Sequence, residues 1–258
     1  MVTSFCFENG KMFKNLINSV KDIITDLQFS VSQNQIRILN LNSNEDVLID
    51  IVIESSNLED FELNRDKIIF CLDSGLLYKI LNYCENKKPL TIYITEDDFH
   101  EGKVNFINIK IDGNVSKLKT IENQLEIECE KMDYDLILQV ETKVFLKNLT
   151  MIVDNAEFIV FDFHKKVFLM NNYNDSVEIE NVIDNEIMEI SDDFSYRSSF
   201  LSKNLKRLLK VNSFCDEMQI SFIKNSPLFF QVEIFDLGIL CFYFKSNDVN
   251  DDCVDVCE

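Results

Sequence analysis

The chain has 258 residues, 46% of them hydrophobic, and its 45 acidic and 25 basic residues give a formal net charge of −20. This length and apolar content suffice for one large or two medium folded domains and exclude a disordered chain. The acidity disfavours nucleic acid or membrane headgroups as partners of most of the surface, and no apolar run is long enough to span a membrane.

The sparse glycine, proline and cysteine residues limit the architecture further. Five Gly and two Pro leave no flexible or proline-rich linker, so any domain junction must be built from ordinary residues. The eight Cys form no Cys-x-x-Cys pair, and no secretory signal opens the chain. The expectation is therefore an intracellular protein with reduced thiols.

Apolar residues recur at helical spacing in four segments, each the length of a short surface helix. The predicted helices cover residues 11–27, 74–84, 143–154 and 200–211, with Asp73, Thr142 and Ser199 as N-caps of the last three. The first and third begin 132 residues apart, and the second and fourth 126 apart. The chain therefore reads as two copies of one unit of about 130 residues.

Short runs rich in Ile, Val and Phe, with polar alternation, lie between these helices and predict antiparallel strands. The runs are 28–32, 36–41, 47–53, 90–95, 104–111, 158–163, 167–170, 177–179, 218–223, 228–235 and 239–244. The predicted fold class is α+β, with two similar domains of antiparallel sheet, each carrying paired helices. The expected boundaries are 1–117 and 134–245 for the domains, 118–133 for an acidic connector, and 246–258 for a mobile acidic tail.

Charge is segregated between the helices and the rest of the chain. The predicted helices hold ten basic against three acidic residues, a net charge of +7, which leaves −27 for all other residues. The basic residues oppose the apolar stripes and are the candidate DNA-binding residues: Lys11, Lys14, Lys21, Lys79, Lys143, Lys147, Lys203, Lys206, Arg207 and Lys210. The alternative is an ordinary solvated helix face. Lysine stripes with few groups suited to base edges favour tracking of phosphates without reading of sequence.

Three stretches resemble one known protein family. Residues 9–53, NGKMFKNLINSVKDIITDLQFSVSQNQIRILNLNSNEDVLIDIVI, are similar to the opening of that family. Asn64-Arg65 and the run LLYKIL (residues 76–81) resemble its DNA-facing signature, and Pro227-Leu228 with FDLGILCFYF (residues 235–244) resemble its closing strands. Asn82 stands where a DNA-facing Lys is common in the family. The chain is therefore identified as a divergent member of the proliferating cell nuclear antigen (PCNA) type of DNA sliding clamp.

The resemblance implies a ring of three subunits that encircles duplex DNA, with helices lining the hole and Arg65 added to the DNA-binding residues. Its implied edge strands are 115–120 and 176–182. It also implies a groove for the interacting peptides of a DNA polymerase, a clamp loader and repair proteins, lined by Leu41, Leu48, Leu125, Ile127, Pro227 and Tyr243. The implied location is the nucleus, or a viral replication site.

No catalytic or metal-binding pattern is present in the sequence. His100 and His164 lack neighbouring zinc ligands, and Cys253 and Cys257 lack further ligands in the tail. Glu96 to Asp98 fit a turn better than a Mg²⁺ site. We therefore expect neither enzymatic activity nor a cofactor.

Two alternatives remain beside a homotrimeric clamp. One is a subunit of the heterotrimeric DNA-damage checkpoint clamp, which shares the fold. The other is a clamp-derived monomeric processivity or transcription factor that binds DNA through one basic face.

Overall fold

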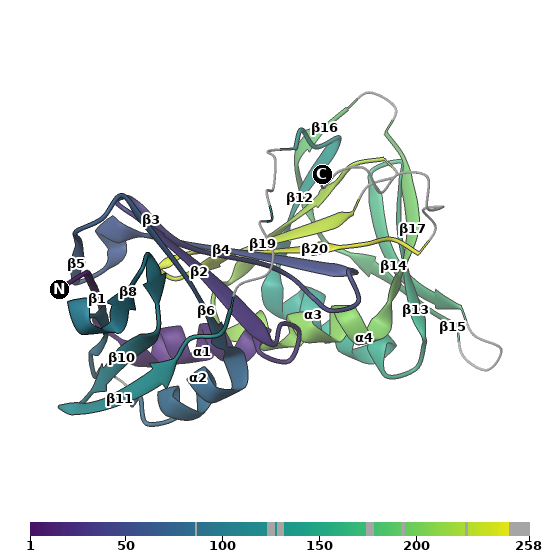
Figure 1. The fold of residues 1–258 in the computed structure, drawn as a ribbon. Helices are drawn as coiled ribbons and strands as arrows, with labels where there is room; N and C mark the ends of the chain where they lie inside the picture. The colour runs from purple at the N-terminus through teal and green to yellow at the C-terminus, as the bar shows by residue number, and fades with distance from the viewer. Residues whose placement is uncertain are drawn as a thin grey trace. The chain divides into compact units, whose positions relative to one another are not determined.

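The computed structural model describes residues 1–85, 87–122, 127, 132–173, 178–191, 194–224 and 227–247 (Figure 1). The chain divides into two compact units, which are described separately. Unit 1 contains residues 1–43, 49–126 and 234–240, and unit 2 contains 44–48, 127–233 and 241–258. The domain boundaries expected from the sequence, 1–117 and 134–245, do not assign residues 44–48 to unit 2 or residues 234–240 to unit 1.

Unit 1 is built mainly of antiparallel strands, with two α-helices that pack against each other. Its elements are β1 Thr3–Phe7, α1 Gly10–Val20, β2 Asp26–Ser32, β3 Gln35–Leu41, β4 Val47–Glu54, η1 Ser55–Asn57, β5 Asp60–Leu63, β6 Lys67–Asp73, α2 Ser74–Leu81, β7 Leu90–Ile94, η2 Glu96–Asp98, β8 Phe99–His100, β9 Lys103–Val104, β10 Phe106–Ile111 and β11 Asn114–Lys119. One sheet has the strand order β11-β10-β7-β1-β5. A second group of strands in this unit pairs in the order β4-β3-β2-β6.

Unit 2 repeats this plan with its own pair of helical segments. Its elements are β12 Leu136–Glu141, α3 Thr142–Val153, β13 Phe158–His164, β14 Val167–Tyr173, β15 Glu178–Ile183, β16 Glu186–Ile190, β17 Tyr196–Leu201, α4 Ser202–Leu205, η3 Lys206–Ser213, β18 Glu217–Phe222, β19 Leu228–Ile234 and β20 Gly238–Phe244. The orders β20-β19-β18-β12-β16 and β15-β14-β13-β17 match the two orders of unit 1.

The pairing pattern confirms the internal repeat. In unit 1, β1 pairs with β5 and β7, while β2 pairs with β3 and β6. In unit 2, β12 pairs with β16 and β18, while β13 pairs with β14 and β17. Each unit thus has a strand, a helix, five strands, a second helical segment and closing strands, and all these pairings are antiparallel. The α+β fold class is confirmed.

Aromatic side chains fix the helices on the sheets in both units. In unit 1 the ring of Phe13 on α1 stacks on Phe7 of β1 at 4.4 Å between centroids. In unit 2 the ring of Phe145 on α3 lies 6.4 Å from Phe161 of β13 and 5.7 Å from Phe230 of β19. Because the apolar side of each helix is buried in this way, its other side is left for solvent or a ligand.

Three helices differ from the prediction, and the second of them in the chain ends at Leu81 and not at residue 84. The first ends at Val20 and not at residue 27, because Lys21 is its C-cap and Leu27 belongs to β2, opposite Leu72 of β6. The apolar residues after Val20 follow the helical period by coincidence. The fourth has one α-helical turn in α4 and continues as the 3₁₀ segment η3.

The structure confirms one of the three predicted N-caps. The Asp73 carboxylate accepts a hydrogen bond of 2.6 Å from the Leu76 backbone N–H at the start of α2. The predictions for Thr142 and Ser199 are wrong, because Thr142 is already the first residue of α3 and the cap of α4 is Leu201.

Gly238 marks a close backbone approach inside unit 1. A Cβ atom at this position would lie 2.0 Å from the Val52 carbonyl oxygen, a separation that no side chain tolerates. Glycine is therefore required where β20 begins.

The predicted connector and tail are only partly described. Within 118–133, β11 continues to Lys119 and Ile121 bridges to Cys71, while 123–126 and 128–131 lie outside the described residues. At the start of the predicted tail, Ser246 is buried against the Ser198 hydroxyl, and the Asn247 N–H donates to the Ser199 carbonyl at 3.0 Å. Ser246 is thus buried and Asn247 is exposed, while residues 248–258 lie outside the described residues.

Candidate nucleic-acid interface

The four helical segments contain no acidic residue at all. With the observed helix ends, α1, α2, α3 and α4 with η3 hold nine basic residues, and the acids Asp22, Asp26 and Asp154 fall beyond the helices. Charge segregation is therefore sharper in the structure than in the sequence-based prediction. The basic residues are Lys11, Lys14, Lys79, Lys143, Lys147, Lys203, Lys206, Arg207 and Lys210.

In unit 1, α1 and α2 lie side by side (Figure 1). The side chains of two lysines of the α1 region reach α2 or its end. The Lys14 ammonium group donates to the Asn82 carbonyl at 3.3 Å. The Lys21 ammonium group pairs with Asp22 at 2.8 Å and lies 5.0 Å from the centre of the Tyr78 ring. Lys79 is exposed and has no ion pair with any acid in the described part of the chain. The predicted residues of unit 1 are thus brought together on one helix pair, Arg65 excepted.

In unit 2, α3 contacts both α4 and η3, and their apolar sides are buried. Lys143 pairs with Asp216 at 3.3 Å, and Lys206 pairs with Asp154 at 2.6 Å. Lys147 and Lys203 are exposed and have no ion pair with a described acid. These surface pairs are weak, since exposed ion pairs contribute about 0–1 kcal/mol, so a polyanion can displace the carboxylates.

Arg65 is the predicted DNA-binding residue that the structure does not place with the helices. It lies between β5 and β6, at the opposite end of the seven-residue strand β6 from α2, about 20 Å along the strand. Its guanidinium pairs with Glu96 at 3.2 Å and lies 5.5 Å from the Phe99 ring.

The described residues of the predicted partner groove are spread over both units. Leu41 belongs to unit 1, whereas Leu48, Ile127, Pro227 and Tyr243 belong to unit 2, and Leu125 lies outside the described residues. The Tyr243 ring lies 4.8 Å from Phe229, which stacks on Tyr134 at 5.1 Å. Sequence reasoning missed Tyr134 and Phe229; the aromatic residue next to Pro227-Leu228 was the available signal.

Asp98 is a second feature that sequence reasoning missed. It is 1% exposed at the end of η2, where its carboxylate accepts hydrogen bonds from the Thr95 hydroxyl at 2.6 Å and the Asn108 amide at 2.7 Å. The Lys117 ammonium group of β11 lies 2.5 Å from the other carboxylate oxygen. Burial alone would raise the pKa of Asp98, but these partners outweigh it and lower the pKa to about 2.

The cysteines and the candidate metal ligands are the other reactive groups of the described residues. The described cysteines form no disulfide with one another, and burial raises the pKa of Cys71 and of Cys84 to about 11, so both thiols stay protonated at neutral pH. Among the residues that the structure describes, no cluster of His, Cys, Asp or Glu could hold a metal ion. No helix in the described ranges is long and apolar enough to cross a membrane.

Both units share one α+β plan, and their helical segments hold basic residues and no acid, while the chain as a whole is strongly acidic. The family described as "Proliferating cell nuclear antigen, N-terminal domain" matches residues 3–136. The chain belongs to the PCNA family.

Relatives cover nearly the whole chain. It is 26% identical to the DNA polymerase sliding clamp of Pyrococcus furiosus, over 92% of this chain and 94% of the relative. It is 20% identical to Proliferating cell nuclear antigen 2 of Plasmodium falciparum, over 86% of this chain and 88% of the relative.

Solved structures share the fold. The PCNA structure from Thermococcus kodakaraensis matches with a TM-score of 0.82 and 17% identity, over 95% of this chain and 99% of that one. The structure from Entamoeba histolytica matches with a TM-score of 0.83 and 18% identity, over 95% of this chain and 98% of that one.

Proposed function

We propose that this protein is a DNA sliding clamp, a non-enzymatic processivity factor that encircles duplex DNA and holds a DNA polymerase on its template. Family membership and the printed names of the relatives support this function. The checkpoint-clamp subunit and the monomeric factor are not favoured, since the relatives with near-complete coverage are polymerase clamps and PCNA.

One observation carries the proposal: in a chain of net charge −20, the four helices hold nine basic residues and no acid. Phosphates attract such a surface whatever the base sequence, while the acidic remainder repels DNA. Lysine suits this role, because its flexible point charge follows a moving backbone without fixing a register. The result is a surface on which DNA can slide.

The proposed assembly is a homotrimer formed head to tail by edge strands. β11 and β15 end their strand orders, as expected for the segments 115–120 and 176–182. A closed ring removes both edges from solvent. Light scattering should give about three times the chain mass of 30.2 kDa. A monomeric mass at micromolar concentration would rule out the homotrimer.

Partner proteins are proposed to dock through short apolar peptides at Leu41, Leu48, Leu125, Ile127, Pro227 and Tyr243. The half-buried Tyr243 and the exposed Pro227 support an accessible apolar surface next to the Tyr134–Phe229 stack. The proposed partners are a polymerase, a clamp loader and repair proteins, in the nucleus or at a viral replication site.

Processive synthesis tests the function. Wild-type protein, loaded on a primed circular template, should lengthen the products that a cognate polymerase makes per binding event. The triple variant Lys79→Glu, Lys147→Glu, Lys203→Glu should lose at least tenfold of that stimulation, since three exposed helix charges are reversed. The matched control Lys67→Glu, Lys103→Glu, Lys224→Glu makes the same charge change on exposed strand and loop positions. If both variants stimulate synthesis equally, the lysines of the helices are not specifically required for the function.

A further inference from the structure

β16 is an edge strand of unit 2 that has uncovered apolar residues. It ends the strand order β20-β19-β18-β12-β16, and β12 is its one neighbour among the described strands. Met188 and Ile190 of β16 are 53% and 41% exposed, and Ile187 is half-buried. An edge strand turns unpaired N–H and C=O groups outward, so apolar side chains beside them favour the addition of another strand.

The equivalent edge of unit 1 lacks this feature. β5 has the place of β16 in the repeat, because it pairs with β1 as β16 pairs with β12. The exposed residues of β5, Asp60 and Glu62, are charged, and Leu63 is buried. Exposed charges protect an edge strand from pairing with other chains. The two copies of the repeat therefore differ at this edge, since β16 exposes large apolar residues and β5 does not.

A β-bulge at Met188 places the two isoleucines of β16 on one face. Ile190 lies opposite Leu136 of β12 and Ile187 lies opposite Leu138, and the register shifts by one residue between these pairs. Leu136 and Leu138 are both buried and are two residues apart, so they share a face of β12. The isoleucines opposite them therefore form a single apolar face at the edge of the sheet.

The acidic residues of β16 share the other face. Glu189 lies opposite Ile137, and Glu186 lies opposite Gln139. Without the extra residue of the bulge, strict alternation would place Glu186 and Ile190 on the same face. Both glutamates are exposed, and neither forms an ion pair with a base in the part of the chain that the structure describes. The edge thus has one apolar face and one acidic face.

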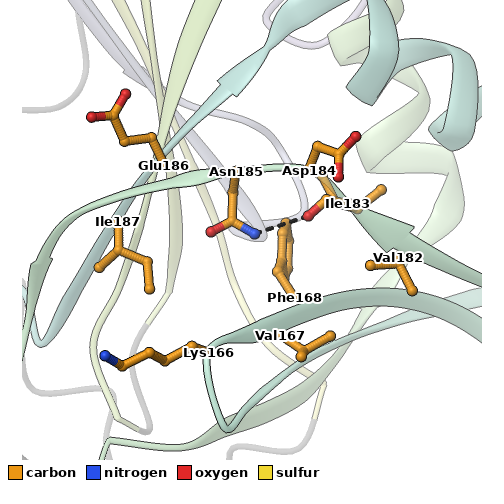
Figure 2. A pocket seen from close by; sticks show the side chains of 9 residues that line it. All are labelled: Lys166, Val167, Phe168, Val182, Ile183, Asp184, Asn185, Glu186 and Ile187. Carbon is orange, nitrogen blue, oxygen red and sulfur yellow. Dashed lines mark hydrogen bonds between the residues drawn. The ribbon is translucent and has the colours of Figure 1, made fainter.

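A pocket adjoins the start of β16. Ile187 lines this pocket of about 470 Å³ together with Val167 and Val182, whereas the Glu186 carboxylate points away from these two valines (Figure 2). Val167 and Val182 are both exposed. The pocket therefore has room for an apolar side chain of a segment that lies along β16.

We propose that β16 binds an extended segment of a partner protein in which basic and apolar residues alternate. The segment adds a strand beside β16, where its apolar side chains contact Ile187, Met188 and Ile190. Its basic side chains face Glu186 and Glu189. Both faces are matched at once, because the side chains of a strand alternate with a period of two. None of these five residues belongs to the helices or to the proposed groove for partner peptides.

Charge disfavours the two occupants that the chain itself could supply. Residues 248–258 contain five acidic residues and no basic one, so they would face Glu186 and Glu189 with like charge. A second copy of β16 has the same two glutamates and a bulge that interrupts its ladder. A basic segment of a different protein fits both faces.

Peptide binding tests this site. The probe is a labelled peptide of alternating Lys and Val. One control peptide alternates Glu and Val, and the other has the Lys and Val residues of the probe in two blocks. Fluorescence anisotropy should show binding of the probe that is tighter than that of either control by about tenfold or more. Equal binding of the probe and the block peptide would overturn the proposal, as would weak binding of all three peptides to an edge that residues 248–258 already cover.

Amide hydrogen exchange locates the bound probe. Exchange should slow at residues 186–190, because the added strand pairs with the outward N–H groups, and should not slow at residues 60–63 of β5. Slower exchange only outside β16 would show that the probe binds elsewhere.

Charge reversal separates the site from the net charge. Glu186→Lys with Glu189→Lys should weaken binding of the probe about tenfold and strengthen binding of the Glu peptide, because attractive pairs become repulsive. The matched control Asp60→Lys with Glu62→Lys makes the same change of net charge on β5 and should keep the affinity within about threefold. An equal loss of affinity in both variants would mean that net charge alone attracts the peptide, which contradicts the site.

A variant of the apolar face distinguishes a partner from a second copy. Ile190→Thr removes apolar surface from an exposed position and should weaken binding of the probe. The mass that light scattering gives for this variant should equal that of the wild-type protein. A lower mass would identify a second copy of the chain as the occupant of β16 and would overturn the proposed partner.

Discussion

Asp98 ties the turn after β7 to the edge strand β11 through one carboxylate. Its partners are Thr95, the N-cap of η2, Asn108 of β10 and Lys117 of β11, so the residue joins the turn to both strands of the following hairpin. Buried carboxylates are tolerated only with such partners, and the loss of the charge leaves donors unpaired.

Asp98→Asn should therefore lower the free energy of unfolding by roughly 2 kcal/mol at neutral pH. Because folding lowers the pKa of this carboxyl from 3.8 to about 2, its stabilisation is present above pH 4 and is lost as the pH falls towards 2. Urea unfolding at fixed protein concentration measures this effect. The exposed neighbour gives the control Asp97→Asn, which should stay within about 0.5 kcal/mol of wild type. A variant at position 98 that matches this control at pH 7 would show that the carboxylate contributes nothing to stability.

Substitutions of Pro227 and Ile127, two residues of the proposed groove, test whether partner peptides dock there. Glu126 and Glu128 flank Ile127 in the sequence, which adds two carboxylates beside the proposed apolar contact. A standard PCNA-interacting peptide should therefore bind weakly, and the same peptide with flanking Lys should bind more tightly by about fivefold or more.

Calorimetry compares the two peptides. Ile127→Ala and Pro227→Ala should each weaken binding, while Leu76→Ala, a change of an exposed apolar residue on α2, should not. Unchanged affinity in both test variants would place the docking surface elsewhere.

Among the elements, the helices carry the proposed contact with DNA, and its salt dependence is measurable. Each lysine lost from a phosphate contact reduces the slope of log affinity against log salt by about 0.9. The variant Lys79→Glu, Lys147→Glu, Lys203→Glu should therefore show a slope lower by up to about 3 on a short duplex.

Fluorescence anisotropy over a salt series provides that slope. The control Lys67→Glu, Lys103→Glu, Lys224→Glu has the same net charge and should keep the wild-type slope. If the slope of log affinity against log salt decreases equally in both variants, the net charge and not the helix surface determines binding.

The element scale also shows what the sequence could predict. Long amphipathic helices and strongly alternating strands were found, because their periods are distinct over many residues. The predicted runs missed β1, β5, β6, β8, β12, β16 and β17. All have at most seven residues and so offer few periods, and β1, β6, β12 and β17 lead directly toward a helix. The first helix was predicted too long because Ile24 and Leu27, which are buried beyond the turn, continue the helical spacing of its apolar residues.

For similar reasons, some residues of the candidate site could be predicted from the sequence and others could not. Helix lysines can be identified from spacing alone, since they oppose an apolar stripe. The Asp98–Lys117 pair and the Tyr134–Phe229 stack depend on pairing between distant strands, which no local pattern encodes. Only the Thr95-x-x-Asp98 spacing, a capping box, gave a local signal, and it identifies the turn without its partner.

For the whole molecule, duplication explains why one chain can present four basic helical segments. Each unit repeats the same order of strands and helices, and each keeps acids out of its helices. The remaining charge is strongly negative, so DNA is repelled except where helices face it. A ring built from such chains would hold DNA by enclosure and need only weak contacts.

Retention on circular and linear DNA tests this enclosure most directly. Protein loaded by its clamp loader on a nicked circular plasmid should stay bound during gel filtration in moderate salt, and cutting the plasmid once should release it within minutes. Bulky blocks at both ends of the linear product should restore retention. Equal retention on circular and unblocked linear DNA would contradict a sliding ring and indicate a protein that binds DNA through one basic face.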